Sequence, residues 1–450
     1  MKKITLIAMF AALLAGCGQA RRNDAAEVSQ DKYNSVVYEL NIRQATPEGT
    51  FAAAERYLPE LKKMGVDIVW LMPIHPIGVD GRKGSLGSYY SISDYEAVNP
   101  EFGDIESFDR FVAAAHDLGL KVIIDWVANH TSRDAKWWKE GHEDWYVLDE
   151  ESGLPIVQYD WTDIAKLDYA NAEMREAMTS AMLFWIGRGV DGFRCDVAYE
   201  VPIDFWQQAF ARIRAVAPDV YLLAEGEKTF LHDSAFDTTY GWDLHHLMNA
   251  IARGEKSAAD LRAYVESDAA AYPAPAMRLM FTSNHDENSW SGSEFERMGD
   301  AAATFAALTF VLPQGQPLIY TGQEIGLDRR LEFFEKDTVD GLTDPQCGAG
   351  WRELYTDLCR LRHTNAALAA GEDIAPMIYM EGAPEDVMAF TREKDGRAVF
   401  CLFNLSAEPQ TVVVTDAVAG GYKTLAGGQY TLTADSSILL APWPRMILTR

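Results

Sequence analysis

The feature that most constrains the fold is a regular alternation of short β-rich apolar runs with amphipathic helical patterns between residues 36 and about 364. The clearest helical patterns are Phe51–Met64, Ile105–Leu118 and Ala172–Gly187. The runs with strand character are Val36–Ile42, Val66–Met72, Lys121–Val127, Gly192–Val197, Val220–Ala224, Phe236–Thr239, Leu279–Ser283 and Leu318–Thr321. Eight strands with crossover helices predict an α/β fold, a (β/α)8 TIM barrel, over residues 36–370.

Two segments depart from this alternation. A polar and aromatic insertion at residues 131–170 follows the third strand, and we expect at least half of its aromatic side chains to be packing and some to contact a ligand: Trp137, Trp138, Trp145, Tyr146, Tyr159 and Trp161. After about residue 371 the helical pattern stops, and short strand-like runs follow at Val387–Thr391, Ala398–Leu402, Gln410–Val414, Gly428–Leu432 and Ser437–Leu440. We therefore predict a C-terminal all-β sandwich domain over residues 371–450.

The N-terminus has the features of an export signal. Lys2 and Lys3 precede an apolar run, Ile4–Ala15, which is shorter than the about 20 residues that a membrane span needs. Leu14-Ala15-Gly16-Cys17 resembles the bacterial lipobox, in which the cysteine is acylated; the alternative is an ordinary signal peptide with a chance cysteine. We predict a signal peptide at residues 1–16, lipidation at Cys17, a tether at 17–35, and anchoring to the membrane in the cell envelope, periplasmic or cell-surface.

Charge and cysteine content narrow the function. With 40 basic and 67 acidic residues the formal charge is -27, which argues against nucleic acid and anionic substrates and suits a neutral ligand, although it also serves solubility. The spacing of the remaining cysteines matches no zinc or redox motif, and we expect isolated thiols at Cys195, Cys347, Cys359 and Cys401.

Four predicted strands end in segments rich in acidic residues and histidine: Asp125-Trp126-Val127-Ala128-Asn129-His130, Gly192-Phe193-Arg194-Cys195-Asp196, Ala224-Glu225-Gly226-Glu227 and Ser283-Asn284-His285-Asp286. In a TIM barrel such segments converge on one rim. Glycosidic cleavage needs an ionised carboxylate to attack the anomeric carbon and a protonated one for the leaving oxygen. Like charge and burial can separate two carboxyl pKa values enough for one site to hold both forms.

With these four segments, in this order and spacing, the chain resembles the α-amylase family of retaining glycoside hydrolases, glycoside hydrolase family 13, over essentially its whole mature length. Further matches are Gly65–Pro73 with the family's second strand, Tyr90–Tyr95 with its sugar-stacking tyrosine segment, and Pro317–Glu324 with its eighth strand. The resemblance implies an α-glucan or maltooligosaccharide substrate and a two-carboxylate mechanism.

The resemblance assigns roles by position. Asp196 is the nucleophile, Glu225 is the general acid and later the base, and Asp286 grips sugar hydroxyls. The residues implied to bind the sugar or support the site are Tyr90 by stacking, His130 and His285 by hydrogen bonds, Arg194 by aiming the nucleophile, and Asp125 from below. Glu227 stays an alternative acid on geometry, because residues two apart on a strand face the same way, although the motif alignment favours Glu225.

The family pattern is incomplete after the nucleophile. Many α-amylases carry Lys-His there, whereas this chain has Val197-Ala198-Tyr199-Glu200. The missing His usually serves a structural calcium, and the missing Lys usually binds sugar beyond the cleavage point. Asn129 and Asp168 match calcium-binding positions in relatives, and their oxygen atoms suit that ion. The sequence therefore leaves open whether a structural calcium is bound, while the chemistry itself requires no cofactor.

The predicted function is hydrolysis of α-glucosidic bonds, mainly α-1,4, in starch, maltodextrins or maltooligosaccharides. A transglycosylase on the same residues differs only in whether water or another sugar intercepts the intermediate. A non-catalytic surface glycan-binding protein would be expected to have lost part of the carboxylate trio, which is present. The sequence leaves open α-1,4 against α-1,6 preference, chain length and endo or exo action; a monomer is assumed.

Overall fold

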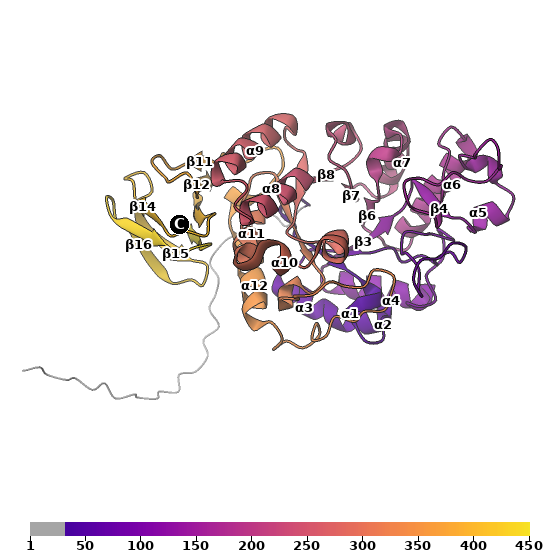
Figure 1. Ribbon diagram of the computed structural model, residues 1–450, viewed down its shortest axis with the longest axis horizontal. Coiled ribbons are helices and arrows are strands. Elements are labelled where there is room, and N and C mark those ends of the chain that lie inside the picture. The colour runs from indigo at the N-terminus through magenta and orange to yellow at the C-terminus, as the bar shows by residue number, and fades with distance from the viewer. Residues whose placement is uncertain (1–31) are drawn as a thin grey trace, which may run out of the picture.

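The computed structural model describes residues 32–450, and in it a closed barrel of parallel strands is followed by an all-β domain (Figure 1). The barrel strands are β1 (Val37–Leu40), β2 (Ile68–Leu71), β3 (Lys121–Trp126), β6 (Gly192–Cys195), β7 (Tyr221–Ala224), β8 (Thr238–Tyr240), β9 (Met277–Met280) and β10 (Gly315–Tyr320). They follow one another around the barrel, and β10 pairs with β1 to close it. The predicted TIM barrel and its eight strands are confirmed.

The barrel interior is a packed core. Val37, Ile68 and Ile123 belong to one buried cluster, whereas alternate strand residues such as Val69 and Leu222 join the larger cluster that includes the helices. This alternation is what strands covered on both faces require. The cavity that could hold a ligand must therefore lie at an end of the barrel, not inside it.

Helices surround the barrel: α1 (Ile42–Ala45), α2 (Phe51–Ala54), α3 (Leu58–Met64), α4 (Ile105–Asp117), α6 (Ala172–Ile186), α7 (Ile203–Val216), α8 (Trp242–Ala252), α9 (Ala258–Ala271), α10 (Glu294–Met298), α11 (Ala302–Thr309) and α12 (Ala349–Thr364). The predicted continuous helix Phe51–Met64 is wrong, because a 3-10 turn at Glu55–Tyr57 separates α2 from α3. Pro59 lies in the first turn of α3, where its missing N–H costs no helical hydrogen bond; inside a longer helix it would cost one.

The insertion folds over the end of β3. Its strands β4 (His130–Ser132) and β5 (Ile164–Lys166) pair antiparallel, and α5 (Lys136–Lys139) lies between them in sequence. In Figure 1 this part occupies the end of the molecule opposite the C-terminal domain.

The C-terminal domain has two sheets with a shared apolar cluster between them. Its strands are β11 (Ile378–Tyr379), β12 (Val387–Lys394), β13 (Arg397–Asn404), β14 (Gln410–Val413), β15 (Gly420–Thr424), β16 (Gln429–Leu432), β17 (Ser437–Leu440) and β18 (Arg445–Thr449). The predicted all-β domain is confirmed, but β11, β15 and β18 were missed. The domain is anchored by fully buried Arg392, whose Nη1 donates to the Val311 carbonyl at 3.0 Å.

The described residues begin before the predicted barrel boundary. Residues 32–34 form a 3-10 turn, the Lys32 ammonium lies 2.6 Å from the Asp237 carboxylate, and the Tyr33 carbonyl accepts from the Ala370 N–H at 2.9 Å. The predicted tether, residues 17–35, is therefore too long at its end, because residues 32–35 pack against the barrel. The predicted signal peptide and Cys17 lie outside the described residues.

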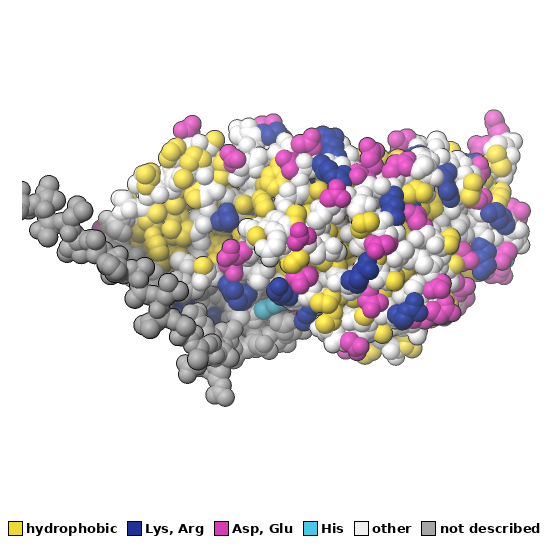
Figure 2. Space-filling model, turned by 90° about the horizontal axis from the view of Figure 1, so that it is seen from below, with side chains coloured by type: hydrophobic (Ala, Val, Ile, Leu, Met, Phe, Trp, Pro, Cys, Tyr) yellow, Lys and Arg dark blue, Asp and Glu magenta, His cyan; other side chains and the backbone are white. Residues whose placement is uncertain are grey.

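One prediction about the described residues can be compared directly with the structure. The four cysteines after Cys17 are free thiols, as predicted. Between residues 32 and 450 no helix has the length and apolarity to cross a bilayer. Figure 2 shows Asp and Glu side chains spread over one face among Lys and Arg, and not gathered into one patch.

Candidate active site

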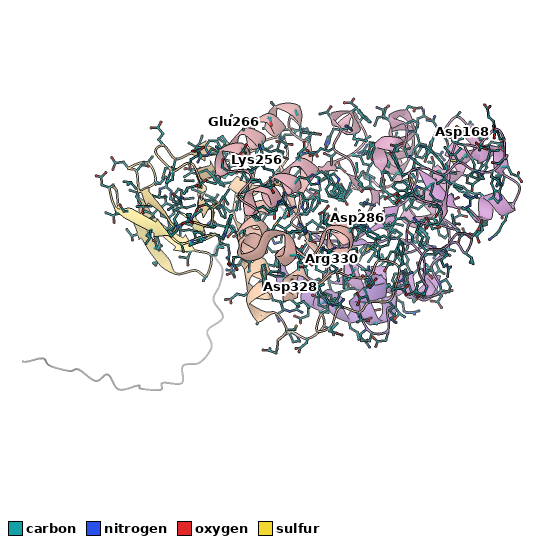
Figure 3. All side chains as sticks on the ribbon, viewed as in Figure 1. Asp168, Lys256, Glu266, Asp286, Asp328 and Arg330 are labelled. Atoms are coloured by element: carbon teal, nitrogen blue, oxygen red, sulfur yellow. The ribbon has the colours of Figure 1, made fainter. Side chains whose placement is uncertain are left out.

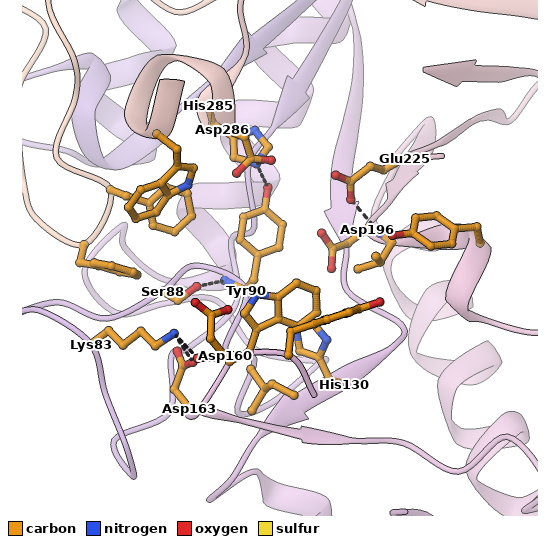
Figure 4. A pocket seen from close by; sticks show the side chains of 18 residues that line it. Lys83, Ser88, Tyr90, His130, Asp160, Asp163, Asp196, Glu225, His285 and Asp286 are labelled. Atoms are coloured by element: carbon orange, nitrogen blue, oxygen red, sulfur yellow. Dashed lines mark hydrogen bonds and ion pairs between the residues drawn. The ribbon is translucent and has the colours of Figure 1, made fainter. Parts of the chain in front are cut away.

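A cavity of about 790 Å³ opens at the carboxyl ends of the barrel strands. Figure 4 shows the labelled carboxylates and aromatic rings gathered around it. Its lining includes six of the predicted site residues: Tyr90, His130, Asp196, Glu225, His285 and Asp286. The other two, Asp125 and Arg194, are fully buried and contact the lining residues from below. The structure thus brings all eight predicted catalytic and sugar-binding residues together.

One guanidinium organises the floor of this cavity. Arg194 Nη1 lies 2.9 Å from Asp125 Oδ1 and 3.1 Å from Asp196 Oδ1, while its Nη2 lies 3.1 Å from Glu225 Oε2. The planar fork of an arginine suits such multiple contacts and stays charged when buried. Asp125 also accepts from the Trp70 indole at 3.2 Å and the Tyr90 hydroxyl at 3.1 Å, which fixes it as a support.

The Asp196 and Glu225 carboxyls differ in pKa. Burial and the adjacent charge of Glu225 raise the pKa of Asp196 well above its usual range. Burial acts the same way on Glu225, but Arg194 and the Val197 N–H outweigh it and lower the pKa of Glu225. Like charges so close do not both ionise freely, so the two carboxyls titrate as one coupled pair.

Strained backbone holds Glu225 in place. Val197, directly after Asp196, has φ 41° and ψ 44°, a left-handed conformation that a β-branched residue rarely adopts. Such a conformation costs on the order of 1–3 kcal/mol and persists only where the surroundings enforce it. It directs the Val197 N–H at Glu225 Oε2, 2.8 Å away.

Glu227, the alternative acid, does not line the cavity. Its carboxylate contacts Arg278 and accepts from the Asp243 N–H at 2.9 Å. Gly226, with φ 158°, lies between Glu225 and Glu227 beyond the end of β7, so the strand alternation assumed for the two carboxylates does not apply. Burial raises the pKa of Glu227 to about 7 despite the nearby Arg278 charge.

A buried acid supports His285 from behind. Glu39 Oε1 lies 2.5 Å from His285 Nδ1, and the Tyr90 hydroxyl lies 2.7 Å from Nε2. Burial alone would lower the pKa of His285, but the Asp286 and Glu39 carboxylates raise it to about 9. His285 is therefore an imidazolium at neutral pH. The sequence analysis did not predict Glu39 as a site residue. The signal that could have identified it is an acidic residue inside the apolar strand β1.

The two walls of the cavity are aromatic. Tyr159, Trp161 and Tyr199 line one side, whereas Trp290, Phe333 and Phe334, none of them predicted, line another. The other insertion aromatics pack within the protein: Trp137, Trp138, Trp145 and Tyr146. Burial lowers the pKa of His130 to about 4, so this ring is neutral and offers one acceptor and one donor.

The side chains of the two residues named for a possible calcium bind different groups. The Asn129 amide donates to Gln158 Oε1 at 2.8 Å, while the Asp168 carboxylate accepts from the Ala170 N–H at 2.9 Å. Figure 3 places Asp168 at the outer end of the insertion, away from Asp286. Among residues 32–450 no group of three or more His, Cys, Asp or Glu side chains is arranged to hold a metal.

The Lys166 ammonium lies near the position considered for calcium. Glu200, at the position of the missing His, accepts from Lys166 Nζ at 3.3 Å and from Gln158 Nε2 at 3.3 Å. Gln158 in turn accepts from Asn129, so these side chains join the insertion to the turn after Asp196. The residues present suit a lysine cation and do not fit a bound calcium.

Comparisons with known proteins agree with this site. Residues 43–349 match the model of the α-amylase catalytic domain, and residues 384–443 match the C-terminal immunoglobulin-like domain of D-apionate lactonase. The chain is 29% identical to α-amylase MalA of Haloarcula japonica over 94% of its own length and 63% of that protein. It is 27% identical to neopullulanase 2 of Thermoactinomyces vulgaris over 81% of its length and 64% of that protein. The chain thus spans less than two thirds of these two curated relatives.

Solved structures extend the likeness to both domains. An α-amylase from Lactobacillus plantarum superposes with a TM-score of 0.80 at 29% identity, covering 93% of this chain and 99% of that one. The maltogenic α-amylase AmyB of Thermotoga neapolitana superposes with a TM-score of 0.83 at 28% identity and the same coverage. The family model covers well over half of the chain and includes every strand-end segment that builds the cavity. The chain therefore belongs to the α-amylase family of glycoside hydrolases.

Proposed function

We propose that this protein hydrolyses α-glucosidic bonds, mainly α-1,4, in starch, maltodextrins or maltooligosaccharides, with retention of the anomeric configuration. The observation that carries the proposal is the single Arg194 guanidinium in contact with both Asp196 and Glu225 at the floor of an aromatic-walled cavity. Retention needs two carboxyl groups close together on the reacting sugar, one as nucleophile and one as acid.

In the first step Asp196 attacks the anomeric carbon, while Glu225 gives its proton to the departing oxygen. This step needs Asp196 ionised and Glu225 protonated, and a bound sugar favours that distribution. A glycosidic oxygen next to Glu225 stabilises the protonated form, and the partial positive charge of the anomeric carbon stabilises ionised Asp196. The Arg194 fork touches both carboxylates and stabilises either distribution.

In the second step Glu225 takes a proton from water, and the resulting hydroxide displaces Asp196 from the sugar. His285, as an imidazolium, donates from Nε2 to a sugar hydroxyl in place of its present partner, the Tyr90 hydroxyl. Asp286, beside it, accepts from sugar hydroxyls. Charge-assisted hydrogen bonds of this kind strengthen as the ring distorts toward the oxocarbenium ion. Tyr90, which lines the cavity, supplies the stacking face.

The test is proton NMR of the protein acting on maltoheptaose, with soluble starch and pullulan in parallel. Early release of the α-anomer is expected, because two inversions at one carbon retain configuration. Early β-anomer would contradict the mechanism, and products longer than the substrate would favour transglycosylation. Measurable binding without turnover of any of the three would favour a glycan-binding role instead.

We further propose that Lys166 replaces a structural calcium. Dialysis against EDTA is expected to leave the Tm and the rate unchanged, since the cation that contacts Glu200 is covalently part of the chain. Lys166→Met should destabilise the fold by about 1 kcal/mol, because it removes the cation from a partly buried carboxylate and leaves that carboxylate only neutral donors.

Lys139→Met is the matched control for this experiment, because Lys139 belongs to the same insertion but its side chain is 61% exposed. Calorimetry with EDTA and with added calcium gives the readout. A Tm that drops with EDTA and recovers with calcium would show a bound ion and contradict the replacement.

Anchoring through Cys17 and a place in the cell envelope are also part of this proposal. They are supported by the basic start, the short apolar run and the lipobox-like Leu14–Cys17. An α-glucan is a large neutral substrate, so an enzyme outside the cytoplasm would meet it before uptake. A monomer is the proposed state.

A further inference from the structure

A loop after β2 crosses one side of the active-site cavity; we call residues 79–88 the strap. At its beginning the strap is tied to the insertion. The Val79 N–H donates to Asp134 Oδ1 at 3.1 Å, and Asp80 lies 3.6 Å from Arg133. Lys83, whose side chain lines the cavity, donates to the Asp160 carbonyl at 3.2 Å.

At its end the strap is tied to a loop that follows β10. The Ser85 N–H donates to Glu335 Oε1 at 2.8 Å, and the Leu86 N–H donates to the Phe334 carbonyl at 3.2 Å. Phe334 and its neighbour Phe333 line the cavity. The insertion, the strap and residues 332–336 are therefore joined by hydrogen bonds into a continuous wall.

Two glycines show how closely the strap is seated. A Cβ on Gly81 would lie 3.0 Å from the Thr162 carbonyl of the insertion, and one on Gly84 would lie 2.5 Å from Phe334 Cβ. Both have positive φ, 72° and 61°, which other residues rarely adopt. The sequence of the strap thus permits close approach on both flanks at once.

The chemistry of the site tells which end of the sugar chain meets this wall. The general acid protonates the leaving oxygen, so the part of the chain toward the reducing end departs past Glu225. The part toward the non-reducing end lies on the opposite side of the cleaved bond. Figure 4 shows Lys83 and Ser88 on the side of the cavity away from Glu225, with Tyr90 between.

Resting on the function proposed above, we propose that the strap closes the non-reducing end of the cavity and makes the enzyme exo-acting. Its substrates are then α-glucan chains with a free non-reducing end, from which it releases short units, and a long chain cannot thread through. The Lys83 ammonium, which lies 3.6 Å from Asp163 Oδ1, is the group of this wall that meets the terminal sugar hydroxyls. The reducing side, with Tyr159 and Tyr199 61% and 41% exposed, stays open to long leaving chains.

The experiment compares maltoheptaose with maltoheptaose whose non-reducing end carries a 4,6-O-ethylidene block, both labelled at the reducing end. The free chain should be cleaved at least about tenfold faster, since a closed wall rejects the added bulk. Its labelled products should shorten stepwise. Equal rates on the two chains would overturn the strap proposal while leaving the hydrolase function standing. No cleavage of either chain would instead count against the function.

A variant pair shows whether the strap causes the discrimination. Lys83→Ala combined with Glu335→Ala removes a cavity-lining side chain and the Ser85 partner, so the free-to-blocked rate ratio should fall toward one. Lys256→Ala is the control, because Lys256 is a half-exposed residue just before α9 that does not line the cavity, and its ratio should match the wild type. An unchanged ratio in the double variant, with the wild-type Tm, would overturn the role of the strap.

Discussion

Replacing Asp196 by Asn is expected to reduce hydrolysis of maltoheptaose by roughly 10⁴-fold or more, because the covalent intermediate can no longer form. Asn keeps the size of the side chain and can still accept from Arg194, 3.1 Å away. The fold should therefore survive, and the loss should be in kcat. Product release followed by chromatography, alongside a thermal melt, gives both readouts.

A rescue experiment with azide tests the assignment of Asp196 as the nucleophile more directly. In Asp196→Gly the small side chain leaves room on the face that the nucleophile occupies, and azide can attack there while fluoride leaves from an α-glucosyl fluoride. The expected product is β-glucosyl azide, by a single inversion. Asp204→Gly is the control, because Asp204 is an exposed residue of α7 paired with Arg175. Retained hydrolysis in Asp196→Asn would remove Asp196 from the role of nucleophile.

Replacing Glu225 by Gln is expected to cost roughly 10²–10⁴-fold on maltoheptaose, the usual contribution of a general acid. The same variant should cleave an α-glucosyl fluoride in its first step almost normally, since fluoride needs no proton to leave. Added azide should then yield α-glucosyl azide, the opposite anomer to that from Asp196→Gly. Rates on the two substrates and the anomer of the azide identify the acid and base separately from the nucleophile.

Glu227→Gln is the matched control for this prediction. Glu227 is two residues away and bears the same functional group, but it is bound to Arg278 outside the cavity. It should retain most activity on both substrates and lower the Tm, because it weakens a partly buried ion pair. A large, leaving-group-dependent loss in Glu227→Gln and not in Glu225→Gln would reverse the assignment.

What could be predicted from the sequence was local. Each barrel strand is a short apolar run. Asp196 and Glu225 directly follow β6 and β7, and Asp286 lies six residues beyond β9, so all three could be expected at one rim once the barrel was recognised. The same local logic failed for Glu227, because Gly226 lies outside β7 and breaks the alternation.

What could not be predicted depends on contacts between distant segments. The strap takes its conformation from hydrogen bonds to the insertion and to Glu335, 250 positions later than Ser85. Glu39 becomes part of the site through His285, 246 positions away. The ionic link of Lys166 to Glu200 likewise joins strand β5 to the turn after Asp196, and no single motif encodes that contact.

The pairing of β1 with β10 has a consequence for how the molecule is made. Val37 is paired with Leu318, so a ribosome must add almost the whole catalytic region before the ring of strands can close. Until then β1 and β9 each present an unpaired edge, a template for association with other chains. Such distant pairing is slow to form and leaves partly folded chains prone to aggregation. The nascent protein therefore passes its most vulnerable period just before its last barrel strand emerges, and it is there that a chaperone would protect it most.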